Sequence, residues 1–278
     1  MTETLAGKTI LMSGGSRGIG LVIALRAARD GANIALLAKT DTPHPKLEGT
    51  VHTAAQQIRD AGGRALPIVG DVRDDDSIAE AVLTTQGEFG GIDIVVNNAS
   101  VIDLSGSLDL AAKKYDLMQD VNVRGTFLLS RAALPMLRDA ANPHILSLSP
   151  PLNITSKWLG AHTGYSLAKF GMTMATLGMA AEFADAGIAA NTLWPRTTIA
   201  TAAVQNVIGG DRLMAVSRTP EIYADAAYEV LTAPARELTG QTLIVEDVLE
   251  AAGVTDFSGY AAVPGTPDAA LYPDIFLD

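Results

Sequence analysis

A glycine-rich turn between an apolar run and an amphipathic stretch is the feature that most constrains this chain. Thr9–Met12 is predicted to form a strand and Ile19–Asp30 a helix. The turn between them contains Gly14, Gly15, Gly18 and Gly20. Glycine lets the backbone approach a pyrophosphate, and such a turn aims the free N–H groups and positive dipole end of a helix at the anion. The pattern therefore predicts a dinucleotide site near the start of the chain.

Two other interpretations of this turn stay open at this point. The spacing G-x-x-x-G-x-G differs from the usual G-x-G-x-x-G, so the turn can also be a strand–helix connection without a ligand. The run Gly14-Gly-Ser16-Arg-Gly18 also fits the G-x-S-x-G nucleophile elbow, with Ser16 as nucleophile. Its position disfavours a hydrolase, because that elbow follows a central strand whereas Ser16 follows the first one.

Composition excludes several classes of protein. A chain of 278 residues suits one large α/β domain, and it has no apolar run of the roughly 18 residues that a membrane span needs. The formal charge of −11 argues against nucleic acid as a partner. The absence of cysteine and of a signal-peptide pattern at Met1-Thr-Glu-Thr predicts a cytoplasmic protein. No metal is expected, because no pair among the four histidines has ligand spacing, namely His44, His52, His144 and His162.

Short apolar runs alternate with longer helical patterns along the chain. The predicted strands are Thr9–Met12, Asn33–Ala38, Ala65–Val69, Asp93–Asn97, His144–Leu148, Ala189–Leu193 and Thr242–Val245. The predicted helices are Ile19–Asp30, Thr50–Ala61, Asp74–Phe89, Lys114–Arg138, Tyr165–Ala186 and Ile222–Thr232. This alternation predicts a single-domain Rossmann fold, with a doubly wound, parallel, seven-stranded sheet and helices on both faces.

The domain organisation follows from the same pattern. Residues 1–250 are expected to form the dinucleotide-binding domain, with a substrate loop at 196–218. Residues 251–278 are expected to form an irregular acidic tail, and residues 40–49 a longer polar loop. Ligands of such a fold bind at the carboxyl ends of the strands.

Polar groups follow several predicted strands at that edge of the sheet. They are Lys39, Asp71, Asn97-Asn98-Ala99-Ser100, Ser149 and Trp194-Pro195-Arg196-Thr197. Any one of them can be a capping or turn residue, but together they favour a site. Tyr165 and Lys169 are four residues apart and share one helix face. An ammonium beside a phenol lowers its pKa from about 10, so this pair can exchange protons nearer neutral pH unless it is an ordinary surface pair.

These motifs together resemble the short-chain dehydrogenase/reductase family over roughly residues 5–250. The match rests on the Gly14–Gly20 turn, Asp71, Asn97-Asn-Ala, Asn122 in Val-Asn-Val-Arg-Gly, Tyr165-x-x-x-Lys169 and the proline after the sixth strand. Within the family the chain looks most like the hydroxysteroid dehydrogenase-like group, through Ala38-Lys-Thr40, Pro43-His-Pro-Lys46, His144-Ile-Leu, Ser149-Pro-Pro-Leu-Asn153 and Leu193-Trp-Pro195.

The resemblance implies hydride transfer between a nicotinamide and a carbonyl or alcohol carbon. Tyr165 would exchange the proton with the substrate oxygen, Lys169 would hold the nicotinamide ribose, and Asn122 would anchor a water that links Lys169 to solvent. Asp71 and Asn98 with Ala99 would contact the adenosine, and Thr201 or a neighbour the carboxamide. The implied cofactor residues are Gly14, Gly15, Ser16, Arg17, Gly18, Ile19, Gly20, Lys39, Asp71, Val72, Asn98, Ala99, Tyr165, Lys169, Pro195 and Thr201.

Charge at the end of the second strand indicates which cofactor is preferred. An acidic residue there binds the ribose 2′-OH and rejects a 2′-phosphate. Here the position is Lys39, and Arg17 lies in the glycine turn, so two cations can reach a 2′-phosphate. This favours NADP and leaves NAD as the alternative, which applies if Lys39 simply points to solvent.

Two departures from the family pattern bear on catalysis. The family's substrate-polarising serine aligns with Pro150 when counted from the strand and near Leu152 when counted back from Tyr165. Ser149 or Asn153 is then the candidate replacement, with Ser149 taken as the fourth catalytic residue. Arg196 also stands where the family usually has glycine after the proline. The alternative function is a nucleotide-binding protein with weak or no catalysis.

The expected partner is a small or lipid-like carbonyl or secondary alcohol. Trp158, Leu159 and Trp194 are candidates for an apolar pocket, although such residues are more often core. By resemblance, the chain is expected to form a homodimer or homotetramer through the helices that contain residues 117–138 and 165–184. The small residues Gly171, Ala175, Gly178 and Ala181 suit close helix packing, within one subunit or between two.

Overall fold

The computed structural model describes residues 4–43 and 48–277, and its centre is one sheet of seven parallel strands. The strand order is β3-β2-β1-β4-β5-β6-β7. The strands are β1 Thr9–Ser13, β2 Asn33–Ala38, β3 Arg64–Val69, β4 Ile94–Asn97, β5 His144–Ser147, β6 Ala189–Trp194 and β7 Thr242–Ile244. All seven expected strands form, with ends shifted by one residue at most. The order reverses beside β1, which opens a crevice between the ends of β1 and β4.

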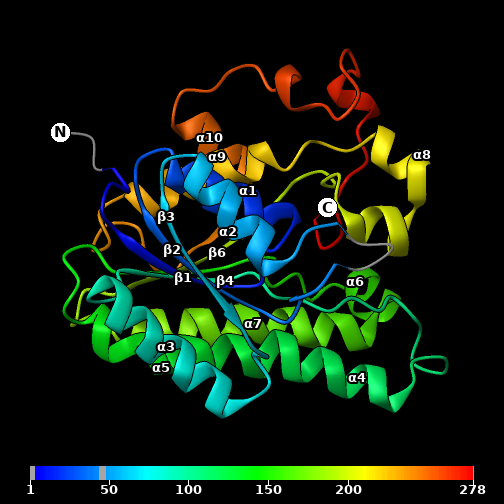
Figure 1. Ribbon diagram of the computed structural model, residues 1–278. Coiled ribbons are helices and arrows are strands. Elements are labelled where there is room, and N and C mark those ends of the chain that lie inside the picture. The colour runs from blue at the N-terminus through cyan, green and yellow to red at the C-terminus, as the bar shows by residue number, and fades with distance from the viewer. Residues whose placement is uncertain (1–3, 44–47, 278) are drawn as a thin grey trace.

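Helices cover both faces of the sheet, as Figure 1 shows. Their bounds are α1 Gly18–Ala28, α2 Val51–Asp60, α3 Asp75–Phe89, α4 Ala112–Met118, α5 Gly125–Leu137, α6 Ser156–Ala161, α7 Thr163–Glu182, α8 Gly210–Ala215, α9 Glu221–Thr232 and α10 Val245–Ala251. Helices α1, α2, α9 and α10 lie on one face, and α3, α5 and α7 on the other. The predicted doubly wound α/β domain is thereby confirmed. No helix within the described ranges is both long and apolar enough to cross a bilayer.

The expected single helix over residues 114–138 is wrong. Helix α4 ends at Met118, a π-helical segment follows over Gln119–Arg124, and α5 begins at Gly125. Within the π segment, the Asn122 amide bonds both backbone groups of Val101, at 2.8 Å and 3.0 Å. A local π segment is a recurrent way to re-aim one side chain within a helix. Hydrophobic periodicity does not report it, so the sequence reading merged the three segments.

The segments around the carboxyl edge are more ordered than the sequence indicated. Residues 196–218 contain a second π-helical segment, Val204–Ile208, and helix α8. Helix α10, which begins directly after β7, was not expected. Beyond it, residues 252–277 follow an extended path with two 3₁₀ turns, Ser258–Tyr260 and Asp268–Ala270. Of the predicted loop 40–49 and the family-like run Pro43–Lys46, residues 44–47 lie outside the described residues.

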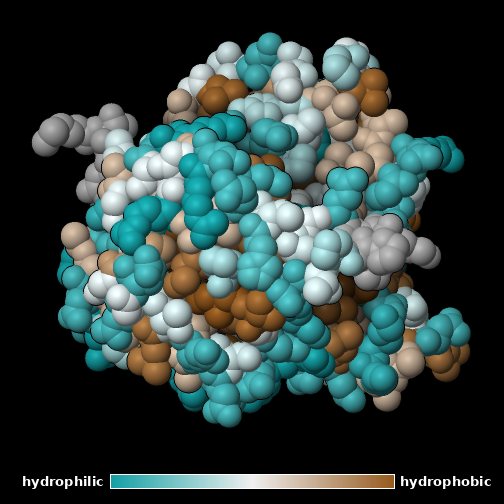
Figure 2. Space-filling view, in the orientation of Figure 1, coloured by the Kyte–Doolittle hydropathy of each residue, from teal (hydrophilic) through white to brown (hydrophobic). Residues whose placement is uncertain are grey.

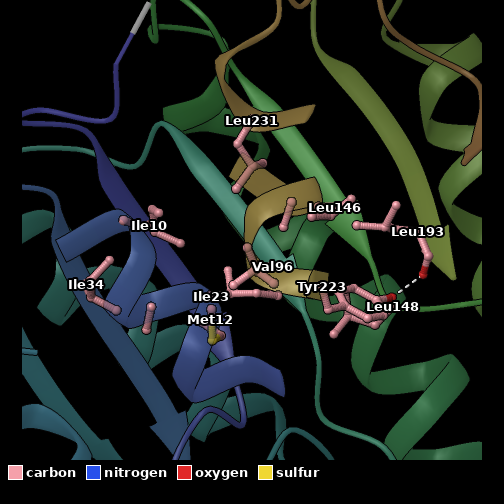
Figure 3. Packing of buried hydrophobic residues seen from close by; sticks show 14 of the residues in the cluster. Ile10, Met12, Ile23, Ile34, Val96, Leu146, Leu148, Leu193, Tyr223 and Leu231 are labelled. Carbon is pink, nitrogen blue, oxygen red and sulfur yellow. Dashed lines mark hydrogen bonds between the residues drawn. The ribbon is translucent and has the colours of Figure 1, made fainter. Parts of the chain in front are cut away.

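Buried aliphatic side chains hold the layers together and reach the edge where ligands are expected. Figure 3 shows Ile10, Val96 and Leu146 between the sheet and the helices above it. In the same cluster the Tyr223 hydroxyl donates a hydrogen bond to the Leu193 carbonyl. Figure 2 shows hydrophilic side chains over both helical layers and apolar ones gathered between them in the middle of the view.

Candidate functional site

The glycine turn lies at the crevice and leaves its backbone accessible. Gly14 and Gly18 have φ of +78° and +59°, conformations that disfavour side chains. A Cβ on Gly14 would lie 2.5 Å from the Asn98 amide nitrogen, so glycine is needed for the close packing of β1 against the end of β4. A Cβ on Gly18 would meet only the Thr201 methyl group, at 3.8 Å. The second position therefore faces open space, as a phosphate cradle requires.

The start of helix α1 has the donors that an anion needs. No side chain caps it at Arg17, and no acidic residue lies in its first turn. Its first N–H groups are therefore available to a ligand. Asn98 donates to the Ser13 carbonyl at 3.1 Å, and the Ser13 hydroxyl accepts from the amides of Asn98 and Ala99 at 3.2 Å. This network fixes the turn to the end of β4, and the arrangement fits a dinucleotide pyrophosphate.

The cations expected to select the cofactor flank the same turn. Arg17 donates to the carbonyls of Glu48 and Gly49, at 2.8 Å and 2.7 Å. Lys39 pairs with Asp71 at 3.1 Å, and its side chain is 61% exposed. Arg73 holds the other side of Asp71. Although burial opposes it, hydrogen bonds from Arg73 and the Lys39 ammonium hold the pKa of Asp71 well below its usual range.

Close packing of the neighbouring loop explains the position of Val72. Val72 is buried, and a Cβ on Gly125 would lie 2.9 Å from its side chain. The start of α5 therefore lies directly against the segment that follows β3. This contact fixes the loop that carries Asp71.

Helix α7 brings Tyr165 and Lys169 together in the interior, not on the surface. Both side chains are less than 5% exposed. The Lys169 ammonium donates to the Leu148 carbonyl at 2.7 Å and lies 5.2 Å from the centre of the Trp194 ring. Burial lowers the pKa of Lys169 to about 7. The alternative of an exposed Tyr–Lys pair is thereby excluded.

The electrostatics of Tyr165 differ from the sequence expectation. Burial and then the Asp274 carboxylate raise the pKa of the Tyr165 phenol well above its usual value, and a hydrogen-bonding interaction with Ser100 opposes the rise. The structure does not meet the expectation that Lys169 lowers the pKa of Tyr165. The physical reason is that burial disfavours charge on both groups, so the phenol stays protonated and available as a proton donor.

The structure places the other two expected catalytic residues away from the reacting groups. Ser149 is fully buried, and its hydroxyl accepts from Thr173 at 3.0 Å behind the site. Asn153 donates to the Phe276 carbonyl at 3.1 Å. Asn122 uses both side-chain groups on Val101, so any water that it anchors would bind its main chain.

A cavity of about 210 Å³ lies at the carboxyl edge and is lined by Tyr165 and Lys169. Its walls come from the ends of β4, β5 and β6, from α7, and from the C-terminal segment. The expected residues that line it are Ile19, Asn98, Tyr165, Lys169, Trp194, Pro195 and Thr201. Much of the remaining lining is apolar: Ile102, Leu104, Leu148, Ile199, Val204, Ile208 and Ile275. Trp158 and Leu159 are not among the lining residues; Trp158 packs against Phe276 instead.

The C-terminal segment around residues 272–276 forms one wall of this cavity, and no pattern in the sequence predicted it. Thr197 and Pro273 form an antiparallel bridge, and Asp274 donates its N–H to the Arg196 carbonyl at 3.0 Å. The Trp194 indole donates to the Ile275 carbonyl at 3.0 Å. Phe276 packs against four aromatic rings, those of Trp158, Tyr165, Phe170 and Trp194.

Two polar residues that line the cavity beside Tyr165, Ser100 and Asp274, had no role assigned to them from the sequence. Ser100 directly follows the Asn97-Asn98-Ala99 motif, and this position in the chain could have identified it as a site residue. Asp274 lies in the tail, more than a hundred residues from Tyr165, and no local pattern marks it. Only the folded path of the chain brings it to the site.

Comparisons with known proteins agree with this arrangement. The family described as short chain dehydrogenase matches residues 8–210. The chain is 52% identical to hydroxysteroid dehydrogenase-like protein 2 of Danio rerio over 277 residues, and 50% identical to that of Homo sapiens. In both cases the match covers 100% of this chain and 65% of the relative. The chain thus spans just under two thirds of the length of these relatives.

Solved structures show the same fold along the whole chain. A putative dehydrogenase from Xanthomonas campestris is 55% identical, with a TM-score of 0.95 and 99% of each chain covered. A short chain dehydrogenase from Mycobacterium thermoresistibile is 57% identical, with a TM-score of 0.93. That match covers 99% of this chain and 96% of the other. The similarity therefore includes the C-terminal segment that closes the cavity.

Proposed function

The chain belongs to the short-chain dehydrogenase/reductase family, and from that premise we propose an NADP-dependent oxidoreductase that acts on an apolar carbonyl or secondary alcohol. The observation that carries the proposal is the buried pair Tyr165 and Lys169 in a cavity that extends to Ile19, at the start of the helix that follows the glycine turn. A bound nicotinamide would supply or accept the hydride there. The family is one of oxidoreductases, and the cofactor and substrate are inferred from the site.

Tyr165 is proposed as the general acid and base. The phenol is protonated at neutral pH, as a general acid must be before it protonates a carbonyl oxygen during reduction. Lys169, with a pKa near 7, is the group that can return a proton to Tyr165 after each turnover. The Leu148 carbonyl holds the lysine amine in place for that role.

The cofactor preference rests on charge at the far end of the glycine turn. No carboxylate ends β2, where Lys39 stands, and Arg17 is fixed nearby by two carbonyls. A 2′-phosphate would gain two cations, whereas a 2′-hydroxyl would lack its usual carboxylate partner. These features support NADP over NAD.

We also propose that the chain pairs with itself through α5 and α7. Phe127, Leu167 and Met174 on these helices are 43%, 53% and 64% exposed. A Cβ on Gly171 would lie 2.7 Å from Val123 of the same chain, so this glycine serves packing within the subunit. A Cβ on Gly178 would meet no atom within 4 Å, which leaves room for a second helix.

The test begins with nicotinamide fluorescence during titration with NADPH and then NADH. Absorbance then follows turnover of a panel of ketones and 3-ketoacyl thioesters. We expect tighter binding of NADPH, and turnover that falls about 10²–10⁴-fold in Tyr165→Phe, as for loss of a general acid. Tyr115→Phe is the matched control, because Tyr115 is on α4, partly exposed and not a cavity residue. Tight NADPH binding without turnover of any panel member would contradict the catalytic part of the proposal.

A further inference from the structure

Asp274 is the one carboxyl among the described residues that line the cavity. Its Oδ1 accepts the Ile275 N–H at 2.7 Å. Within residues 4–43 and 48–277, no protein group donates a hydrogen bond to Oδ2 or forms an ion pair with it. The carboxyl is therefore anchored through one oxygen and leaves the other for a ligand in the cavity.

The backbone around Asp274 is held on both sides, so the position of the carboxyl is fixed by the fold. Before it, Thr198 donates to the Tyr272 carbonyl at 2.9 Å, and Tyr272 donates to the Val216 carbonyl at 2.8 Å. After it, Phe276 is 1% exposed in its aromatic cluster. Catalytic groups need such support to keep a productive geometry.

The charged and titratable groups that face Asp274 come from three helices. Lys169 and Tyr165 lie on α7, Tyr223 on α9, and Glu246 on α10. Burial and, after it, the Glu246 carboxylate raise the pKa of Asp274 to about 7. The hydrogen bond from the Ile275 N–H and the charge of Lys169 oppose this rise. Glu246 itself is turned toward Arg218 and the Arg196 N–H. Asp274 therefore carries a proton in mildly acidic solution and can act as a hydrogen-bond donor.

Among the described residues, the counterparts of the family's serine are engaged elsewhere and do not serve as the second donor to a carbonyl oxygen beside Tyr165. The family's serine aligns with Pro150 or near Leu152, neither of which has a side-chain donor, and the Ser149 hydroxyl accepts from Thr173. Ser100 lines the cavity, but its hydroxyl interacts with the Tyr165 phenol. A preorganised donor at a developing oxyanion contributes about 10²–10³-fold to turnover, so a replacement is chemically important.

We propose that Asp274 is a second catalytic residue, whose protonated carboxyl donates a hydrogen bond from Oδ2 to the same substrate oxygen that Tyr165 protonates. The inference rests on the proposed reductase function. In the reduction, a bound nicotinamide would supply the hydride for the new C–H bond, and the C=O π electrons would take the Tyr165 proton to form O–H. Asp274 polarises the carbonyl and keeps its own proton.

The test compares Asp274→Ala, Asp274→Asn and Ser100→Ala in the full chain with the best substrate of the wild type. We expect Asp274→Ala to lower kcat about 10²-fold, as for loss of one oxyanion donor, with the Kd for NADPH unchanged. Asp274→Asn keeps a donor and should retain at least a tenth of kcat. The wild-type kcat should decline above about pH 7, where both Asp274 and Lys169 lose their protons, and in Asp274→Asn only the part of this decline that belongs to Lys169 should remain.

Infrared difference spectra between pH 6 and pH 8 give a readout that is independent of turnover. We expect a protonated-carboxyl C=O band in the wild type that is absent from Asp274→Asn. Asp256→Ala, which removes an exposed acid of the same tail, should match the wild type in every measurement. It controls for a general loss of negative charge.

Three results would overturn the inference. An Asp274→Ala enzyme with kcat within twofold of the wild type shows that the carboxyl is not a catalytic donor. Loss of NADPH binding in that variant shows a structural or cofactor role. Loss of turnover in Ser100→Ala alone assigns the donor to Ser100. Absence of turnover in the wild type itself overturns the proposed function, and this result is distinct because it precedes any substitution.

Discussion

The two walls of the cavity are held in place by different interactions. The glycine-turn wall consists of backbone groups and side chains that follow strands, joined by short hydrogen bonds such as those of Ser13 and Asn98. The tail wall, residues 272–276, is held by aromatic packing around Phe276 and by backbone bonds to residues 196–198. The first wall offers N–H donors and cations, and the second offers an apolar surface with one carboxyl.

This difference separates two tasks within one site. Donors and cations suit the phosphates of a nucleotide, whereas an apolar wall with a single acid suits an uncharged substrate. Substitutions in the tail wall should therefore change substrate turnover without changing nucleotide affinity, and substitutions in the turn wall should do the reverse. The predictions below test that separation.

The largest effect is expected from Phe276→Ala. Replacing a buried phenylalanine by alanine costs about 3–5 kcal/mol in protein cores. Here the substitution weakens the packing of residues 272–276 against the cavity. We expect the tail to leave the cavity, turnover to fall at least about 10²-fold, and the NADPH Kd to stay within about threefold. Tryptophan fluorescence reports the docking directly, because the chain has two tryptophans and both contact Phe276.

Phe89→Ala is the control for this variant, since Phe89 is partly buried on α3 and does not line the cavity. It should leave tail fluorescence unchanged. Loss of NADPH affinity in parallel with turnover in Phe276→Ala would show that the two walls act as one unit.

A matched pair of glycine substitutions has the next largest effect. Gly14 and Gly265 have φ of +78° and +84°, so alanine adds a left-handed strain of about 1–2 kcal/mol at either position. A Cβ on Gly14 would also clash with Asn98, whereas a Cβ on Gly265 meets nothing within 4 Å. We expect Gly14→Ala to lose NADPH binding and Gly265→Ala to keep it. Thermal unfolding and fluorescence titration measure both quantities, and equal losses of affinity would contradict the assignment of the turn.

The same contrast explains how much of the molecule could be predicted from the sequence. Strands β1, β2, β4, β5 and β6 are buried throughout and are continuous apolar runs, so they were recognised. The edge strands β3 and β7 are partly exposed but mostly apolar, and they were recognised too. The polar residues that follow the strands were placed at the correct edge. Tyr165 and Lys169 share one face because helix geometry is local. Such features depend on neighbours within a few residues.

The missed features depend on contacts between distant residues. The π segment around Asn122 is stabilised by Val101, which lies before α4. Ser149 follows a strand, as a catalytic serine would, but Thr173 turns its hydroxyl away from the cavity. Asp274 reaches the cavity only because residues 272–274 pair with residues 196–198. No local pattern encodes that pairing.

The two walls should also respond to pH in opposite directions. The pKa of Asp71 is lowered, so its contribution to stability is present above its unfolded pKa of about 3.8 and is lost in acid. The pKa of Asp274 is raised to about 7, so its favourable contribution is complete below about 3.8 and is lost as pH rises through 7. Between pH 5.5 and pH 8.5, tail docking should therefore weaken while the turn wall stays unchanged.

Tryptophan fluorescence across that range measures the docking, and the Kd for NADPH measures the turn wall. In Asp274→Asn the change in fluorescence across this range should become smaller, because the titrating carboxyl is gone and Lys169 alone still titrates beside Trp194. A pH-dependent change of equal size in this variant would assign the effect to Glu246 or Lys169, the other groups that face the same point.

The smallest effect is expected from Lys39→Ala. Lys39 is 61% exposed and already pairs with Asp71, so its attraction to a 2′-phosphate is screened by water and shared with a carboxylate. We expect NADPH affinity to fall about fivefold to tenfold, which corresponds to about 1–1.4 kcal/mol, and NADH affinity to stay the same. Lys113→Ala on α4 is the charge-matched control. If both nucleotides weaken equally, Lys39 acts through Asp71 on the adenosine itself, and selection of NADP rests with Arg17, which two carbonyls already hold beside the turn.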